Sequence, residues 1–497
     1  MRGNSGPLAR LGDNDGGSRF AGDSPPHSLP RRSQRLRTIR ESGTGPRNRL
    51  VHNPGPFYSR VMNSSSVRRI TAVLTVAALF ASMKNSSAQP AGFNYDESKV
   101  KPYSLPDPLL LDNGRRVTTS RQWENQRRPE LLELFTEEMY GRSPGKPRRV
   151  KGEVTSMDKS ALGGKAIRKE VTITLAGPNG NHQIHLLMYL PPAARKPVPV
   201  FLGLNFDGNQ SINPDPGITL AMQWVQTNKS GDFTAQRAPE SSRGKSIGRW
   251  AVETILARGY ALATVYAGDI EPDYNNSFKN GVHALYFKEG QSTPAHDEWG
   301  TVAAWAWGLS RVMDYFEKDG DIDAKKVIVT GHSRMGKAAL WAGATDPRFA
   351  IVISNESGEG GAALARRWFG ETTARINTSF PHWFSGNFKK YNDREIDLPF
   401  DQHELIALIA PRPVYIASAE GDQWSDPRGE FLSGKHAEPI YGLYGKSGLG
   451  VKDQPELNKS VGDFIAYHIR TGKHDVTDFD WAQYLDFADR HLGRAKK

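Results

Sequence analysis

Residues 327–342 read VIVTGHSRMGKAALWA, and this stretch decides the fold. Its first four residues are β-branched and predict a buried strand, whereas its last five are rich in helix formers. The glycines between them allow a sharp turn, which lifts Ser333 above the end of the strand and places it at a helix N-terminus. The spacing is G-x-S-x-x-G, because Met335 stands where a G-x-S-x-G pattern has its second glycine. The stretch predicts a nucleophilic serine on a strand-to-helix elbow; the alternative is an ordinary glycine-containing turn with an incidental serine.

The rest of the chain repeats the order of strand, turn and helix. Residues 299–316 carry apolar side chains at near-helical spacing and predict a crossover helix. Residues 150–190 alternate like antiparallel strands and predict one edge of the sheet. Short apolar runs predict further strands at 198–204, 260–266, 349–354 and 414–419. This pattern is typical of an α/β protein with a mainly parallel sheet.

Composition narrows the classes of function. The chain has 497 residues, 37% of them hydrophobic, and no cysteine, which excludes disulfides and thiolate chemistry. Its formal charge of +11 lies almost wholly in residues 1–88, which carry 13 Arg and one Lys against four acidic residues. The remaining 409 residues are nearly neutral, so they have no electrostatic footprint for nucleic acid, and we expect no nucleic-acid partner.

The N-terminal region is predicted to be processed before the protein acts. Residues 1–61 are rich in Gly, Pro, Ser and Arg and are interpreted as a disordered or mis-annotated extension. Residues 62–88 contain a pair of arginines, an apolar run of 12 residues and the small-residue end Ser86-Ser87-Ala88, the order of a cleavable signal peptide. An anchor or basic tail is the alternative. We therefore expect a secreted or periplasmic protein with no membrane attachment after cleavage and a single catalytic domain at 89–497.

A serine nucleophile requires a base and an orienting acid, which follow it in the order acid then histidine on this type of fold. Glu356 and Asp422 each follow a predicted strand, so both are expected at the sheet edge where Ser333 emerges. His474 lies in the last loop before the predicted terminal helix 481–492 and is the expected base.

Other histidines are expected to have structural roles. His403, His468 and His491 fall within apolar patterns interpreted as helical. No pair of histidines combines with a carboxylate at metal-ligand spacing, so the sequence predicts no metal site.

Three segments together resemble the glucuronoyl esterases, a family of carbohydrate esterases. They are TGHSRMGK at 330–337, NESGEGG at 355–361 and FLGLNFDGN at 201–209, and the likeness extends over most of residues 101–492. The Ser-Arg-x-Gly-Lys elbow is its most specific part. The resemblance implies an exported bacterial α/β-hydrolase, a three-layer sandwich, that cleaves the ester between the glucuronic acid of glucuronoxylan and lignin alcohols without a metal or other cofactor.

The resemblance also implies roles for individual residues. It makes Ser333 the nucleophile, His474 the base and Glu356 the favoured triad acid, with Asp422 as a second partner of the histidine. Arg334 matches the arginine that stabilises the oxyanion in the family. Three further residues match sugar contacts, and these are Lys337, Glu371 and Trp424.

Alternative functions remain at this point. An acetyl-xylan esterase or broad carboxylesterase uses the same fold, although a small acetyl ester has no use for the sugar-binding Lys337. A non-catalytic carbohydrate-binding protein on a hydrolase scaffold and a serine peptidase are more distant alternatives. We expect a monomer.

Overall fold

The computed structural model describes residues 89–226 and 233–493, all of which belong to one compact unit, Ser82–Lys497. The predicted extension at 1–61 and the predicted signal peptide at 62–88 lie outside the described residues. None of the helices in the described ranges is long and apolar enough to cross a membrane.

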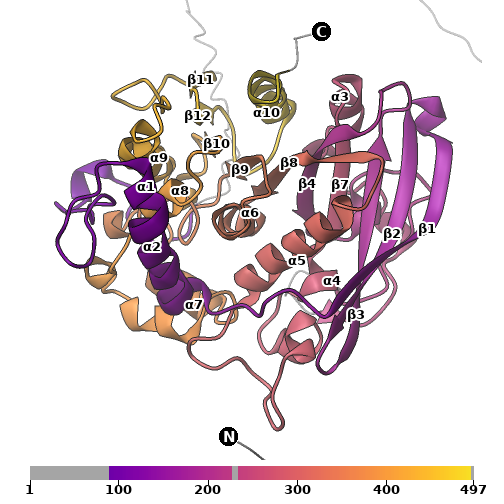
Figure 1. The fold of residues 1–497 in the computed structure, drawn as a ribbon, viewed down its shortest axis with the longest axis horizontal. Helices are drawn as coiled ribbons and strands as arrows, with labels where there is room; N and C mark the ends of the chain where they lie inside the picture. The colour runs from indigo at the N-terminus through magenta and orange to yellow at the C-terminus, as the bar shows by residue number, and fades with distance from the viewer. Residues whose placement is uncertain (1–88, 227–232, 494–497) are drawn as a thin grey trace, which may run out of the picture. The chain divides into compact units, whose positions relative to one another are not determined.

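A ten-stranded sheet forms the centre of the unit (Figure 1). Its spatial order is β1-β2-β3-β7-β4-β8-β9-β10-β12-β11, and the run from β7 to β12 is parallel. The strands are β1 (Arg149–Ala161), β2 (Ala166–Gly177), β3 (Gly180–Leu190), β4 (Val198–Asn205), β7 (Ala261–Tyr266), β8 (Ile322–His332), β9 (Ile351–Asn355), β10 (Val414–Ala419), β11 (Lys459–Gly462) and β12 (Ile465–Arg470). The short strands β5 (Val225–Gln226) and β6 (Phe233–Thr234) pair separately.

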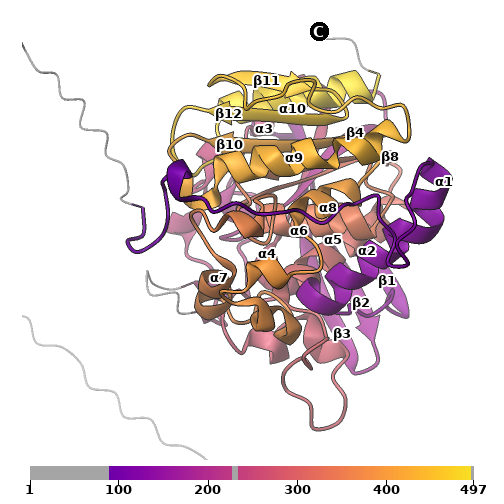
Figure 2. The ribbon, with the colours of Figure 1, turned by 90° about the vertical axis from the view of Figure 1, so that its left-hand side faces the viewer.

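Helices cover both faces of the sheet, which explains why the parallel strands are continuous apolar runs. One apolar core lies between the sheet and α5 (Thr301–Phe316), α6 (Arg334–Thr345), α8 (Gln402–Ala407) and α9 (Pro427–Gly442). A second core lies under α3 (Val252–Ala257) and α10 (Asp478–His491), on the other side (Figures 1 and 2). The remaining helices are α1 (Ser120–Gln122), α2 (Arg128–Phe135), α4 (Ala267–Ile270) and α7 (Thr373–Ser379).

The sequence predictions for the fold are largely confirmed. The mainly parallel sheet, the antiparallel edge at 150–190 and the crossover helix at 299–316 are all present. One interpretation was wrong, because His468 lies on strand β12 and not in a helix. The apolar run 465–470 is buried at every position, and a fully buried strand has no period that distinguishes it from a buried helix.

Candidate active site

The elbow is built by close backbone approaches. Ser333 joins β8 to α6 with φ 57° and ψ −129°, a conformation that side-chain-bearing residues rarely adopt. A Cβ at Gly331 would lie 2.0 Å from the Met335 carbonyl oxygen, so no other residue fits there. The Ser333 amide donates to the Asn355 carbonyl oxygen at 2.8 Å, which ties the elbow to the end of β9. The local sequence therefore forces the serine out of the strand direction.

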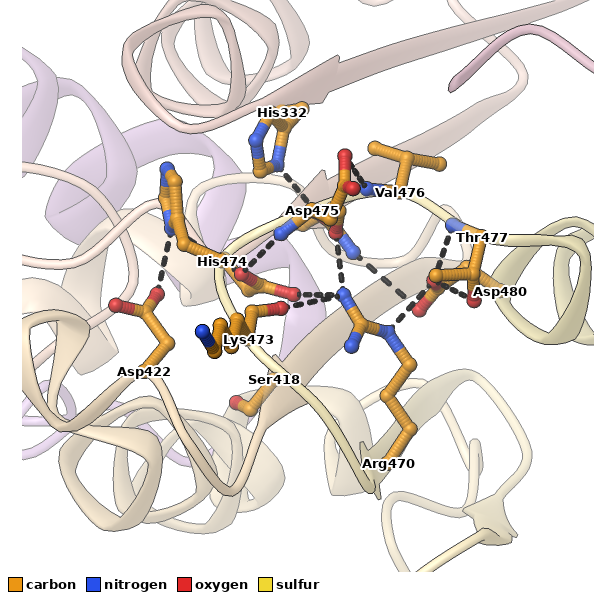
Figure 3. A network of polar contacts seen from close by, with 12 residues as sticks. His332, Ser418, Asp422, Arg470, Lys473, His474, Asp475, Val476, Thr477 and Asp480 are labelled. Carbon is orange, nitrogen blue, oxygen red and sulfur yellow. Dashed lines mark hydrogen bonds and ion pairs between the residues drawn. The ribbon is translucent and has the colours of Figure 1, made fainter. Parts of the chain in front are cut away.

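Two carboxylates meet one histidine at the neighbouring strand ends, and Figure 3 labels the nearer one, Asp422, beside His474. His474 Nδ1 lies 2.6 Å from Asp422 Oδ2 and 3.1 Å from Glu356 Oε2. Both acids are buried, and Glu356 has a φ of 47° directly after β9. The ring of His474 lies 4.4 Å from that of His332, the residue before Ser333. With Nδ1 facing the carboxylates, Nε2 is left for the serine side.

The electrostatics of this cluster favour a basic histidine. Burial works to lower the pKa of His474, but the hydrogen bonds to Asp422 and Glu356 outweigh it and raise that pKa. Burial also works to raise the pKa of Asp422, and the bond from His474 outweighs it and lowers that pKa. Burial dominates for Glu356, whose pKa is raised. Asp422 is therefore the more firmly ionised partner.

Arg470 organises the loop that carries the histidine, a role that was missed in the sequence. Its guanidinium donates to Glu356 Oε1 at 2.6 Å and to Asp480 Oδ2 at 2.8 Å, and it also holds the carbonyl oxygens of Lys473 and Asp475 (Figure 3). Glu356 thus has a fixed cation on one oxygen and the histidine on the other. Arg470 is buried and is the last residue of β12. Because this strand was not predicted, the position of Arg470 at a strand end was not recognised.

One group of side chains in the described part of the chain has the composition of a metal site. Ligand atoms of His332, Glu356 and His474 all lie within 4.8 Å of one another. The bond from Arg470 to Glu356 places a permanent positive charge beside this group, which disfavours a cation there.

Arg334, the first residue of α6, is held in an aromatic box beside the serine. Its guanidinium lies over Trp383 at 4.7 Å, Phe380 at 5.3 Å and Phe206 at 5.9 Å. Its Nη1 donates to Asp273, whereas its buried Nε has no hydrogen-bond partner among the described residues. The Arg334 side chain remains 30% exposed, so part of this fixed cation beside the nucleophile can face a negative charge that develops during reaction.

Asp273 is the second residue that was missed in the sequence. It accepts from the Trp383 indole at 2.7 Å, lies 3.0 Å from His382 Nε2 and forms an ion pair with Arg334. Burial works to raise its pKa, but Arg334 and the other donors outweigh burial and lower it. Asp273 lies soon after β7, at the same sheet edge as Ser333. Its position after a predicted strand could have identified it as a candidate from the sequence.

The predicted sugar-contact residues form a second cluster one helical turn beyond the serine. Lys337 is buried, and its Nζ donates to the carbonyl oxygens of Ser357 at 2.5 Å and Glu359 at 2.6 Å. Glu371 Oε2 lies 3.9 Å from that Nζ, and the Glu371 amide donates to the Trp424 carbonyl oxygen at 2.9 Å. Lys337 Nζ also lies 5.8 Å from the centroid of Trp383. The structure thus places Ser333 and Arg334 at the elbow and the pair Lys337 and Glu371 around the same helix, α6.

A ten-stranded α/β sheet with a serine on a strand-to-helix elbow defines an α/β-hydrolase. Comparisons with known proteins identify the family. Residues 247–445 match a family model described as glucuronyl esterase of fungi. Carbohydrate esterase MZ0003, from an unknown prokaryotic organism, is 54% identical over 410 residues, which are 82% of this chain and 93% of that protein.

Two further relatives agree. The solved glucuronoyl esterase from Solibacter usitatus is 54% identical, has a TM-score of 0.75 and matches over 80% of this chain and 100% of that one. The 4-O-methyl-glucuronoyl methylesterase of Schizophyllum commune is 27% identical over 389 residues, which are 76% of this chain and 82% of that protein. The chain belongs to the glucuronoyl esterase family, carbohydrate esterase family 15, and is a carboxylic-ester hydrolase.

Proposed function

We propose that this protein hydrolyses esters of glucuronic or 4-O-methyl-glucuronic acid in glucuronoxylan, including those to lignin alcohols. The proposal rests on one observation, which is that the residues suited to ester cleavage lie next to a buried lysine and a largely buried glutamate. Lys337 and Arg334 both lie over the Trp383 ring, and Lys337 and Glu371 offer one donor and one acceptor for sugar hydroxyls. A simple acetyl esterase has no need of that second cluster.

The proposed reaction proceeds through an acyl-enzyme. Ser333 Oγ attacks the carbonyl carbon of the uronate ester as His474 Nε2 takes the hydroxyl proton. The Arg334 guanidinium stabilises the negative charge on the tetrahedral oxygen. The C–O bond to the alcohol then breaks, and His474 returns the proton to the leaving oxygen. Water deprotonated by His474 hydrolyses the acyl-enzyme and restores the serine.

Asp422 is proposed as the principal orienting acid and Glu356 as its support. The support for this order is the shorter contact of Asp422 with Nδ1, at 2.6 Å against 3.1 Å, and the bond that Glu356 makes to Arg470. The resemblance alone favoured Glu356. Both acids keep the imidazole tautomer that presents Nε2 to the serine.

The decisive experiment compares three esters with the segment 89–497. Benzyl glucuronate, benzyl galacturonate and 4-nitrophenyl acetate are assayed with the unmodified segment and with Ser333→Ala. Rapid release from the glucuronate that disappears in Ser333→Ala is the expected result. Hydrolysis of the acetate alone would overturn the substrate, and no hydrolysis of any ester would overturn the catalytic assignment.

The boundaries and the compartment are part of the proposal. We propose that residues 62–88 direct export and are removed, that residues 89–497 form a single catalytic domain, and that the mature enzyme acts outside the cytoplasm as a monomer. The nearly neutral mature chain suits a polysaccharide substrate. Amino-terminal sequencing of the exported protein tests the first point, with Gln89 as the expected first residue.

A further inference from the structure

A cleft of about 450 Å³ lies along the segment that precedes α1. Figure 2 shows this indigo segment crossing the face that carries α8 and α9. The contacts agree, because His403 of α8 lies 2.9 Å from the Pro106 carbonyl oxygen and Arg428 of α9 lies 3.6 Å from Glu97. Aromatic, cationic and aliphatic side chains line the cleft, chiefly Phe93, Tyr95, Lys101, Tyr103, Trp368 and Ile396.

The cleft lies next to the loops of the predicted sugar-contact residues Glu371 and Trp424, and not next to the nucleophile. Phe93 packs edge-on against Trp424 with ring centroids 4.9 Å apart. The Gly370 amide donates to the Asn94 carbonyl oxygen at 2.8 Å, directly before Glu371. The same short segment therefore contacts the loops of both predicted sugar-contact residues. An occupant of this cleft would be joined to the sugar part of the substrate, and not to the alcohol that leaves.

Trp368 is partly exposed in the cleft and has an unusual backbone conformation. It is 38% exposed and ends a short 3₁₀-helix in a left-handed conformation, with φ 49° and ψ 42°. A bulky residue rarely adopts that conformation, and such strain is often found at ligand-binding sites. Ile396, which is 60% exposed, lies in the same lining. An exposed indole of this kind offers a flat apolar face for a pyranose ring.

The cationic side chains that line the cleft differ in whether a carboxylate lies beside them. Arg366 and Arg367 are neutralised by the buried Asp401 and Asp426, and Lys99 lies 3.5 Å from Asp96. Lys101 is exposed and has no carboxylate within 4.0 Å among the described residues; its ammonium lies 5.4 Å from the centroid of the Trp368 ring. The lining contains no acidic residue. This cleft thus favours an anionic ligand over a neutral one.

We propose that the cleft is a second carbohydrate subsite, in which Trp368 supports a pyranose ring of an acidic xylan chain and Lys101 pairs with a uronate carboxylate on that chain. The subsite rests on the proposed function, because it places a further part of the polysaccharide whose esterified uronate lies at Ser333. It extends the enzyme's recognition beyond the single sugar at the nucleophile.

Binding of an unesterified polymer tests the subsite without any turnover. Ser333→Ala protein is titrated by calorimetry with glucuronoxylan and with uronate-free arabinoxylan. We expect Trp368→Ala and Lys101→Gln, each added to Ser333→Ala, to weaken glucuronoxylan binding about three- to tenfold. Met157→Ala and Lys159→Gln, at exposed positions of β1, are the matched controls and should leave the affinity unchanged. Lys101→Gln keeps the test valid if Trp368→Ala fails to fold.

The outcomes separate the subsite from the proposed function. Unchanged affinity in both variants would overturn the subsite. A loss with Trp368→Ala alone, equal for both polymers, would show a neutral-sugar or aromatic site and overturn the pairing with Lys101. If benzyl glucuronate is not hydrolysed and yet both variants lose glucuronoxylan affinity, the proposed function fails and the subsite stands. With active enzyme, the ratio of KM on esterified glucuronoxylan to KM on benzyl glucuronate should rise in both variants.

Discussion

The two carboxylates at His474 lead to a quantitative prediction about their removal. Asp422→Asn and Glu356→Gln each delete one charge and keep the side-chain volume. At an effective dielectric constant of about 20, unit charges 2.6 Å and 3.1 Å apart differ in attraction by about 1 kcal/mol. That difference corresponds to about fivefold in rate. Arg470 further reduces the influence of Glu356, because it neutralises the other oxygen of that carboxylate.

We therefore expect Asp422→Asn to lower kcat on benzyl glucuronate at least about fivefold more than Glu356→Gln does. The double variant should lose about four orders of magnitude, the cost of removing the only orienting acid from a serine triad. Each single variant keeps one carboxylate on Nδ1, so the double loss should exceed the product of the single losses. Circular dichroism melting of all three variants controls for folding.

The pH profile gives a second readout of the same cluster. A base works only when it is unprotonated, so activity declines as pH falls through the pKa of His474. The neighbouring carboxylates raise that pKa, and the removal of Asp422 should lower it. The acid limb of kcat/KM should consequently move to lower pH in Asp422→Asn. An acid limb that stays in place, together with losses that simply multiply, would refute the shared-histidine reasoning.

Three further predictions concern the surrounding residues. Asp273→Asn should lower kcat about tenfold with little change in KM, because Arg334 loses the partner that positions it. In an Arg334→Ala background, Asp273→Asn should have no added effect on kcat. An additive loss in the double variant would contradict the positioning role. Glu371→Gln should raise KM for benzyl glucuronate and leave 4-nitrophenyl acetate hydrolysis unchanged, and equal effects on both esters would contradict a sugar contact. Gly331→Ala should lower the free energy of unfolding by about 3 kcal/mol or prevent folding, whereas Gly145→Ala, where an added Cβ meets nothing within 4 Å, should melt like the parent.

The elements whose formation depends on residues close together in the sequence were predictable. The strand, turn and helix around Ser333 follow from β-branched residues, glycines and helix formers in immediate succession. The strand ends that carry Glu356 and Asp422 follow from the same kind of pattern. These features need no knowledge of distant residues, since each is determined within about ten positions.

The partners of these residues were not predictable in the same way. Arg470 reaches Glu356 across 114 residues, and Asp273 reaches Arg334 across 61. Such pairs arise only when the strand order places two ends side by side, and that order is not encoded in any local pattern. Strand β12 shows the same limit, because its six buried residues fit a helix and a strand equally well.

Arg470 explains how a second carboxylate is accommodated beside the base. Two uncompensated acids on one imidazole would hold it protonated and remove its ability to accept the serine proton. Arg470 bonds to Glu356 at 2.6 Å, and the second carboxylate that it contacts, Asp480, also lies 2.9 Å from His468 Nε2. Arg470 therefore offsets part of the charge of Glu356, although both acids still raise the pKa of His474. Arg470 also works to lower the pKa of Glu356, so Arg470→Met should favour the protonated form of that acid, weaken its effect on His474 and move the acid limb of kcat/KM to lower pH, as Asp422→Asn does. An acid limb that stays in place would show that Arg470 acts only by holding the loop.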